Sequence, residues 1–268
     1  MAASQTSARA GAWLAVALLL GGCPGDTNLP PRDGSAPVVQ ISGRVVDLET
    51  CVSEGGCAGV ANLRVSLFYD ATTVSDKTGP EGGFSLRGVP GNRNHYLLVS
   101  DALGTGVIVS CLQAEPVATA SVDVFGVELY AVRRQGGLYA AIAQEAAVDL
   151  ATHAIYVGQV FYLKGGTSMT ALADASAVTT PSLPVRYVSC NPRFKDPVCP
   201  AALFDAKRAT TGPLGEFVAL GQGKLGDVKI AVTSPNHTFT QVSAPLGNGY
   251  LTVGTHQGKA KPTDGGGS

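Results

Sequence analysis

The chain has 268 residues, of which 45% are hydrophobic and 15% charged, and its formal net charge is −1. This composition supplies enough apolar material for one large or two ordinary domains, which excludes a wholly disordered chain. It provides no basic surface for nucleic acid. Glycine (34 residues) and proline (16 residues) are frequent, which favours many short strands separated by turns.

The chain begins with a segment that is typical of an export signal. Residues 11–20, GAWLAVALLL, form an apolar run that is too short to span a bilayer, which needs about 20 residues. The run closes as Leu20-Gly21-Gly22-Cys23, which resembles the bacterial lipobox. The resemblance implies that residues 1–22 are removed and that Cys23 carries diacylglyceryl and N-acyl chains. An ordinary secretory signal with an incidental cysteine is the alternative.

A lipidated Cys23 predicts a protein held at the cell envelope. Several acyl chains, each contributing about 0.8 kcal/mol per buried CH₂, anchor a protein where one chain does not. Pro24 stands where an aspartate would favour the inner membrane, so we expect attachment to the outer membrane. Residues 23–37 are rich in proline and glycine, and they predict an extended tether between lipid and folded protein.

A first set of strands is predicted over residues 38–132. Apolar and polar residues alternate over 63–70, which places Leu63, Val65, Leu67 and Tyr69 on one buried face. Further strand-like segments follow the same pattern or are short and apolar, namely 41–47, 96–100, 106–110 and 122–130.

The cysteines after Cys23 suit an oxidising compartment. Two local pairs, Cys51 with Cys57 and Cys190 with Cys199, each bracket a loop that contains glycine or proline, and we expect two disulfides. Cys111 is left over and follows an apolar segment, which favours a buried free thiol. Other pairings of the five cysteines remain open.

The motif T-G-P-x-G-x-F occurs twice, over 78–84 and over 211–217. A glycine turn that leads into an inward phenylalanine suits a chain reversing into a strand. The upstream patterns align Val65 with Val185, and the longer second copy then has its extra residues around Cys190–Cys199. The repeat predicts a second sandwich over 156–257, followed by a disordered tail over 258–268.

The segment between the copies, 133–155, is predicted to be a linker. Its part GLYAAIAQEAAVDLATH (137–153) is rich in alanine, with Leu138, Ile142, Ala146 and Leu150 near helical spacing. We expect a helix of about 12 residues, with a further pair of strands as the alternative.

The first copy resembles the carboxypeptidase regulatory-like domain, a transthyretin-like sandwich. The residues that carry the resemblance are Gly43-x-Val45, Gly59-Val60-Ala61, Val65, Thr78-Gly79 through Gly82 and Phe84, and the later Leu97 and Val99. The resemblance implies an accessory domain that stabilises or binds and is not itself catalytic. The predicted fold is therefore all-β, with two tandem transthyretin-like (Ig-like) β-sandwiches joined by a short helix-containing linker.

No motif in the chain points to catalysis, so no catalytic residue, metal ligand or cofactor is predicted. CxxC is absent, the histidines are scattered, and His95 is expected at the surface. The one tryptophan, Trp13, lies in the signal, and several tyrosines occupy alternating positions that suit a core, which disfavours a sugar-binding platform.

We therefore expect a lipid-anchored cell-envelope protein that acts as a structural or protein-interaction module. Its expected partners are the membrane, through the lipid on Cys23, and other envelope proteins or glycans, but no nucleic acid. A glycan- or peptide-binding module that uses the loops 51–57 and 190–199 is the alternative.

Overall fold

The computed structural model describes residues 37–51, 57–75, 77–135, 137–165, 168–189, 202–205 and 207–262. The predictions for the signal, for Cys23 and for the disulfide between Cys190 and Cys199 lie outside the described residues. Residues Ala36–Ser268 belong to one compact unit. None of the helices within the described ranges is long and apolar enough to cross a membrane.

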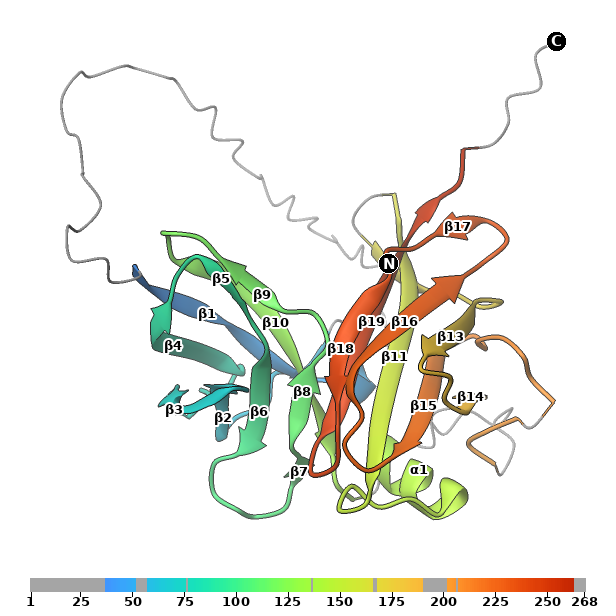
Figure 1. Cartoon of the computed structure of the whole chain (residues 1–268), viewed down its shortest axis with the longest axis horizontal. Helices are drawn as coiled ribbons and strands as arrows, with labels where there is room; N and C mark the ends of the chain where they lie inside the picture. Colours follow the sequence, from blue (N-terminus) through green and yellow to red (C-terminus); the bar gives the residue numbers. More distant parts are fainter. Residues whose placement is uncertain are drawn as a thin grey trace, which may run out of the picture. The chain divides into compact units, whose positions relative to one another are not determined.

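The first sandwich contains two layers of strands (Figure 1). One layer runs in the order β4 (Gly83–Pro90), β1 (Val38–Asp47), β10 (Val124–Arg133) and β7 (Ile108–Val109). The other layer runs in the order β3 (Asp70–Val74), β2 (Leu63–Leu67), β6 (Leu97–Asp101) and β8 (Cys111–Gln113). A short ribbon of β5 (Arg93–His95) with β9 (Val117–Thr119) and the 3₁₀ turn η1 (Leu48–Thr50) complete it.

The second sandwich repeats this plan. Its larger layer runs in the order β14 (Val185–Tyr187), β15 (Glu216–Gln222), β11 (His153–Lys164) and β19 (Leu251–Ala260). Its smaller layer runs in the order β13 (Ser176–Thr180), β16 (Gly226–Thr233) and β18 (Val242–Leu246). The short strands β12 (Ser168–Ala171) and β17 (His237–Thr238) pair with β11 and β19.

The last strand continues beyond the point where the sequence predicts a disordered tail. Residues Gly258 to Ala260 belong to β19, and Ala260 pairs with His237 of β17. Lys261 then donates its backbone amide to the carbonyl of Asn236 at 2.9 Å. The predicted disorder is therefore wrong for residues 258–261, because neighbouring segments satisfy their polar backbone groups.

The two sandwiches share one sheet. Strand β8 of the first pairs in parallel with β19 of the second, with Cys111 opposite Leu251 and Gln113 opposite Val253. This pairing joins a layer of each sandwich into a ten-stranded sheet. The predicted all-β class with two sandwiches and a helical linker is confirmed, and the continuous sheet makes the two halves a single body.

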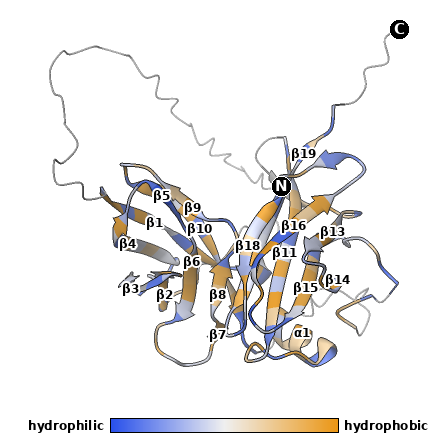
Figure 2. Ribbon diagram, viewed as in Figure 1, coloured by the Kyte–Doolittle hydropathy of each residue, from blue (hydrophilic) through white to orange (hydrophobic). Residues whose placement is uncertain are grey.

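Hydrophobic and hydrophilic residues follow one another along the strands of the second sandwich (Figure 2). The hydrophobic residues of its shared sheet belong to two separate clusters, because successive side chains of a strand point to opposite faces. Ile155 and Val157 of β11 belong to the cluster that continues into the first sandwich. Tyr156, between them, belongs to the cluster that fills the second sandwich together with Phe217 of β15. The shared sheet therefore has apolar side chains on both faces.

The two repeats match in backbone detail. In each, a central strand pairs in parallel with one neighbour and antiparallel with the other: β1 lies between β10 and β4, and β11 lies between β19 and β15. Gly82 and Gly215 of the repeated motif both have a positive φ, of 77° and 67°. A Cβ at either position would collide with a backbone oxygen, that of Val45 or of Val160, so the motif requires glycine there.

The structure corrects one alignment of the repeat. Leu63 exchanges hydrogen bonds with Thr78, and Ala175 exchanges the same bonds with Thr211. Ala175 therefore corresponds to Leu63, which makes β13 the counterpart of β2. The alignment of Val65 with Val185 is wrong, because Val185 lies on β14, an additional strand at the edge of the shared sheet.

The linker contains the predicted helix as α1 (Leu138–Ala146), nine residues long. Leu138 and Ile142 are fully buried, and the helix ends at Ala147, which has a positive φ of 54°. Glu145 of the helix accepts the backbone amides of Leu203 and Phe204 at 2.6 and 3.0 Å. The helix thereby holds the segment 202–205 of the second sandwich.

Candidate functional site

Aromatic rings gather where turns of the two sandwiches meet. Phe68 and Tyr69 form the turn after β2, Tyr96 separates β5 from β6, and Tyr250 precedes β19. The ring centroid of Phe68 lies 4.8 Å from that of Tyr69 and 5.0 Å from that of Tyr250, and Tyr69 lies 6.3 Å from Tyr96. We call these residues the aromatic junction.

Tyr69 is 74% exposed, which contradicts its predicted place on a buried face. The alternating pattern breaks because β2 ends at Leu67 and the chain turns at Phe68 and Tyr69 before β3 begins at Asp70. Side chains in a turn no longer follow the two-residue period of a strand. An exposed aromatic side chain with two ring neighbours provides a ready contact surface.

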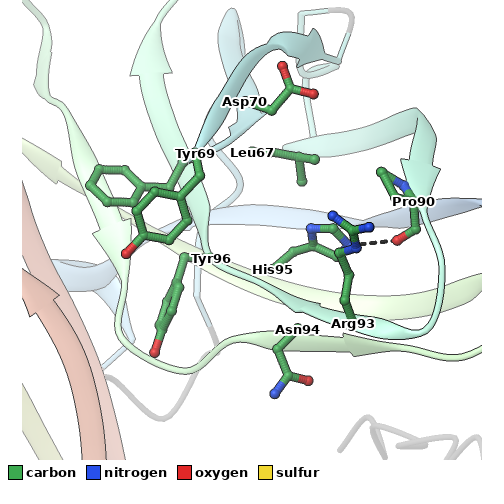
Figure 3. A pocket seen from close by; sticks show the side chains of 9 residues that line it. Leu67, Tyr69, Asp70, Pro90, Arg93, Asn94, His95 and Tyr96 are labelled. Atoms are coloured by element: carbon green, nitrogen blue, oxygen red, sulfur yellow. Dashed lines mark hydrogen bonds between the residues drawn. The ribbon is translucent and has the colours of Figure 1, made fainter.

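A pocket of about 200 Å³ opens beside Tyr69 (Figure 3). The turn after β2 lines one wall, and the segment from Arg93 to Tyr96 lines the other. His95 is buried, contrary to its predicted surface position, and its Nε2 lies 2.7 Å from the carbonyl oxygen of Pro90. This hydrogen bond fixes the histidine in the wall and leaves the polar groups of Arg93 and Asn94 at the rim.

Tyr96 links this pocket to a second one. Its hydroxyl donates to the carbonyl oxygen of Ser243 at 3.0 Å, which ties the first sandwich to β18 of the second. Tyr96 also lines a larger pocket of about 560 Å³. The other residues that line it are Glu115, Pro116, Phe161, Thr240, Gln241, Val242, Ser243, Thr255, His256, Gln257 and Lys259.

The larger pocket has one buried and one half-buried titratable group in its wall, His256 and Glu115. His256 is 2% exposed, its Nε2 lies 2.9 Å from the hydroxyl of Tyr156, and burial lowers its pKa to about 4. Its Nδ1 has no hydrogen-bond partner among the described residues. Glu115 accepts the backbone amide of Thr255 at 2.8 Å, and burial raises its pKa.

Local electrostatics keep the phenols of the junction protonated. Burial raises the pKa of Tyr250 to about 12, helped by Tyr69 and Asp227. Burial and then the charge of Asp227 also raise the pKa of Tyr69 and Tyr96. The tyrosine hydroxyls are therefore neutral groups that can donate and accept hydrogen bonds.

The predicted cysteine sites lie apart from the residues that line these pockets. The disulfide Cys51–Cys57 is present and follows η1. Cys111 is a buried free thiol on β8, as predicted, and burial raises its pKa to about 12. Among the described residues, no group of three or more histidine, cysteine or acidic side chains could hold a metal ion.

The aromatic junction does not follow from the sequence pattern. Its rings come from positions 68–69, 96 and 250, and the alternation over 63–70 places Tyr69 in a strand although it lies in a turn. The two successive aromatic residues before Asp70 favour a strand that ends at Leu67. Neighbouring side chains of a strand point to opposite faces, so both rings cannot face one core.

No family model and no curated protein matches the chain. Among solved structures, it is similar to the minor pilin GBS52 of Streptococcus agalactiae, at 13% identity over 86% of this chain and 99% of that chain, with a TM-score of 0.29. It is similar to the shaft pilin SpaA of Lactobacillus rhamnosus GG at 8% identity over 85% and 99%, with a TM-score of 0.26. It is also similar to the TIE protein of Bacillus anthracis at 11% identity over 84% and 34%, with a TM-score of 0.22. Similarity at this level bears on neither activity nor ligand.

Proposed function

We propose that this chain is a non-catalytic module of the cell envelope that binds its partner at the aromatic junction. The observation that carries the proposal is the 74% exposure of Tyr69 beside two further rings on a single folded body. Aromatic rings bind through contact area and through the polar hydroxyl of tyrosine, and the raised pKa values keep these phenols in the weakly nucleophilic protonated form.

The shared sheet supports a binding role for the junction. Phe68 and Tyr96 belong to the first sandwich and Tyr250 to the second, so any movement between the halves would disperse the rings. The pairing of β8 with β19 and the bond from Tyr96 to Ser243 oppose that movement. Binding sites work best when a rigid scaffold positions residues on its turns.

The proposed location rests on the N-terminal sequence. Lipid on Cys23 and the tether 23–37 would hold the sandwiches close to a membrane, which we propose is the outer membrane. The disulfide Cys51–Cys57 supports an oxidising compartment such as the envelope. The partners within reach would be other envelope proteins or envelope glycans.

Photo-crosslinking in intact cells tests the binding role. A benzophenone amino acid replaces Tyr69 in the full chain, since a benzophenone inserts into C–H bonds of protein and glycan alike. The control carries it at Val178, which is 62% exposed on the edge strand β13. We expect a discrete adduct from position 69 only. The proposal fails if position 69 forms no adduct or if both positions form the same one.

The intact mass of the protein extracted from its own membranes tests the anchor. We expect residues 23–268 plus a diacylglyceryl group and one acyl chain. A lipid-free mass would disprove the anchor and leave the binding role of the junction to be judged by crosslinking.

A further inference from the structure

We infer that the aromatic junction and the larger pocket together bind a neutral oligosaccharide of at least two sugar units. One unit would stack on Tyr69, and the next would enter the pocket that contains Glu115 and His256. This inference rests on the proposed function, because it names the ligand of the same surface.

Tyr69 is suited to stacking against a sugar. A pyranose ring presents an apolar C–H face and a rim of hydroxyl groups, and it therefore needs an open aromatic face with polar groups around it. Most of Tyr69 is uncovered, while Phe68 and Tyr96 meet it at interplanar angles of 63° and 81°. These steeply inclined neighbours hold the ring in place.

The groups around Tyr69 can both accept hydrogen bonds from sugar hydroxyls and donate hydrogen bonds to them. Asp70, Arg93 and Asn94 line the adjoining pocket (Figure 3). Hydrogen bonds from Thr72 and Thr73 lower the pKa of Asp70, so this carboxylate is an acceptor, while arginine and asparagine donate. Each of these planar side chains has more than one hydrogen-bonding atom, so a single side chain has the atoms to bond to two adjacent hydroxyls of a sugar.

The charges favour a neutral ligand. Asp70 and Arg93 line the first pocket, and Glu115 and Lys259 line the second, so each pocket has, besides a histidine, one acidic residue and one arginine or lysine. An anionic or cationic ligand would meet a like charge in either pocket. A neutral molecule with many hydroxyl groups can instead form hydrogen bonds to both the acidic and the basic residue of each pocket.

The larger pocket has the size and polar lining of a small-molecule site. His256 is one of its lining residues, and the buried Nδ1 of this ring has no hydrogen-bond partner among the described residues. The pocket volume of about 560 Å³ lies within the range of roughly 300–1,000 Å³ for small-molecule sites. The polar residues Thr240, Gln241 and Gln257 line the same pocket.

Tyr96 explains why the ligand should span two units. It lines both pockets, and its hydroxyl is already bonded to Ser243, so it is a fixed wall between adjacent subsites. A peptide that binds by strand addition fits this arrangement less well, because it needs a free strand edge, whereas Phe68, Tyr69 and Tyr250 stand in turns.

Ligand-observed NMR and calorimetry on the full chain in detergent micelles test the inference. The probes are cellotetraose, chitotetraose and an α-linked mannotetraose, each compared with its monosaccharide. We expect saturable binding of at least one tetrasaccharide, with an affinity at least about tenfold above that of its monosaccharide. Glu115→Gln should reduce this advantage of the longer ligand.

Exchanges at Tyr69 locate the site. Tyr69→Ala should weaken tetrasaccharide binding at least about tenfold, whereas Tyr69→Phe, which keeps the ring, should weaken it no more than about threefold. Val178→Ala is the matched surface control. Thermal melting of each variant confirms that it folds, as expected for a side chain so exposed.

Failure of the ligand class can be told apart from failure of the proposed function. If no tetrasaccharide binds and the crosslink from position 69 captures a polypeptide, the oligosaccharide inference is overturned and the binding role stands. If neither binding nor crosslinking occurs, both are overturned. Oligosaccharide binding that Tyr69→Ala leaves unchanged overturns the inference too.

Discussion

Thr211 makes in the second sandwich the same hydrogen bonds that Thr78 makes in the first. Each hydroxyl donates to a backbone carbonyl at 2.7 Å, that of Val60 for Thr78 and that of Leu172 for Thr211. Each hydroxyl also accepts a backbone amide, at 2.9 and 3.0 Å. Both side chains are buried, so one threonine in each repeat replaces the backbone pairing that is missing where a strand begins.

Replacing either threonine by valine should destabilise the protein. Valine preserves the shape but leaves a buried amide and a buried carbonyl without the hydroxyl, which costs about 1–3 kcal/mol of unfolding free energy. Because the two sandwiches share a sheet, Thr78→Val and Thr211→Val should each lower the midpoint of one common transition in urea.

The serine variants are the controls, since they retain the hydroxyl. Two separate transitions, with only one moved by each variant, would contradict the cooperative unit inferred from the shared sheet.

Glu216 should make the protein less stable as the pH rises. It is fully buried on β15, and burial, together with the charge of Glu49, raises its pKa to about 8. The unfolded chain releases this proton near pH 4.3, so between about 4.3 and 8 the folded state holds more protons than the unfolded state. The stabilisation is complete below that window and is lost as the pH rises through it.

Glu216→Gln should remove this dependence and raise the unfolding free energy at pH 8.5 by up to about 5 kcal/mol, because each pKa unit corresponds to about 1.4 kcal/mol. Urea denaturation at pH 5 and pH 8.5 measures the effect. The control is Glu81→Gln, at a glutamate that is exposed in a turn, and it should leave the unfolding free energy unchanged at both pH values. A variant at position 216 that keeps the full pH dependence would rule out Glu216 as its source.

Cys111 should be inert in the folded protein. The thiolate is the reactive form of cysteine, and burial on β8 raises the pKa of this thiol to about 12 while excluding reagents. Alkylation by iodoacetamide at pH 8 should be at least about a thousandfold slower in the native protein than in guanidinium chloride. Peptide mapping by mass spectrometry distinguishes Cys111 from the other cysteines, and comparable labelling in both states would refute its burial.

Glu145 should hold the segment 202–205 against the helix. Glu145→Ala removes the carboxylate that accepts the amides of Leu203 and Phe204, and the unfolding free energy should fall by about 1 kcal/mol. Hydrogen exchange at these two amides should accelerate more than exchange in β11. Glu145→Gln retains an acceptor, so its exchange rates at these amides should lie between those of the wild type and of Glu145→Ala. Unchanged exchange in Glu145→Ala would show that another contact holds the segment.

The sequence predicted local features well where a single physical rule governs them. Alternation identified β2 up to Leu67, the alanine-rich spacing identified α1, and proximity identified the disulfide Cys51–Cys57. The repeated T-G-P-x-G-x-F identified the repeat, because glycine is required where a Cβ would strike the neighbouring strand.

The failures occur where a pattern continues past the end of an element. Tyr69 fits the alternation of β2 but lies in the turn after it. The segment from Gly258 has few apolar residues, as a disordered tail would, but it continues β19 to Ala260. Val185 resembles Val65 because both lie in short β strands, and only the hydrogen bonds of Thr211 show that β13 is the true counterpart of β2.

By itself the sequence determined that this chain is an all-β repeat with a helical linker and an N-terminal segment typical of a lipidated exported protein. Only the tertiary structure decided that β8 lies beside β19 and that Phe68, Tyr69, Tyr96 and Tyr250 meet at one surface. The reason is that periodicity reports which face of a strand is apolar, whereas the choice of neighbouring strand depends on contacts between residues far apart in the chain.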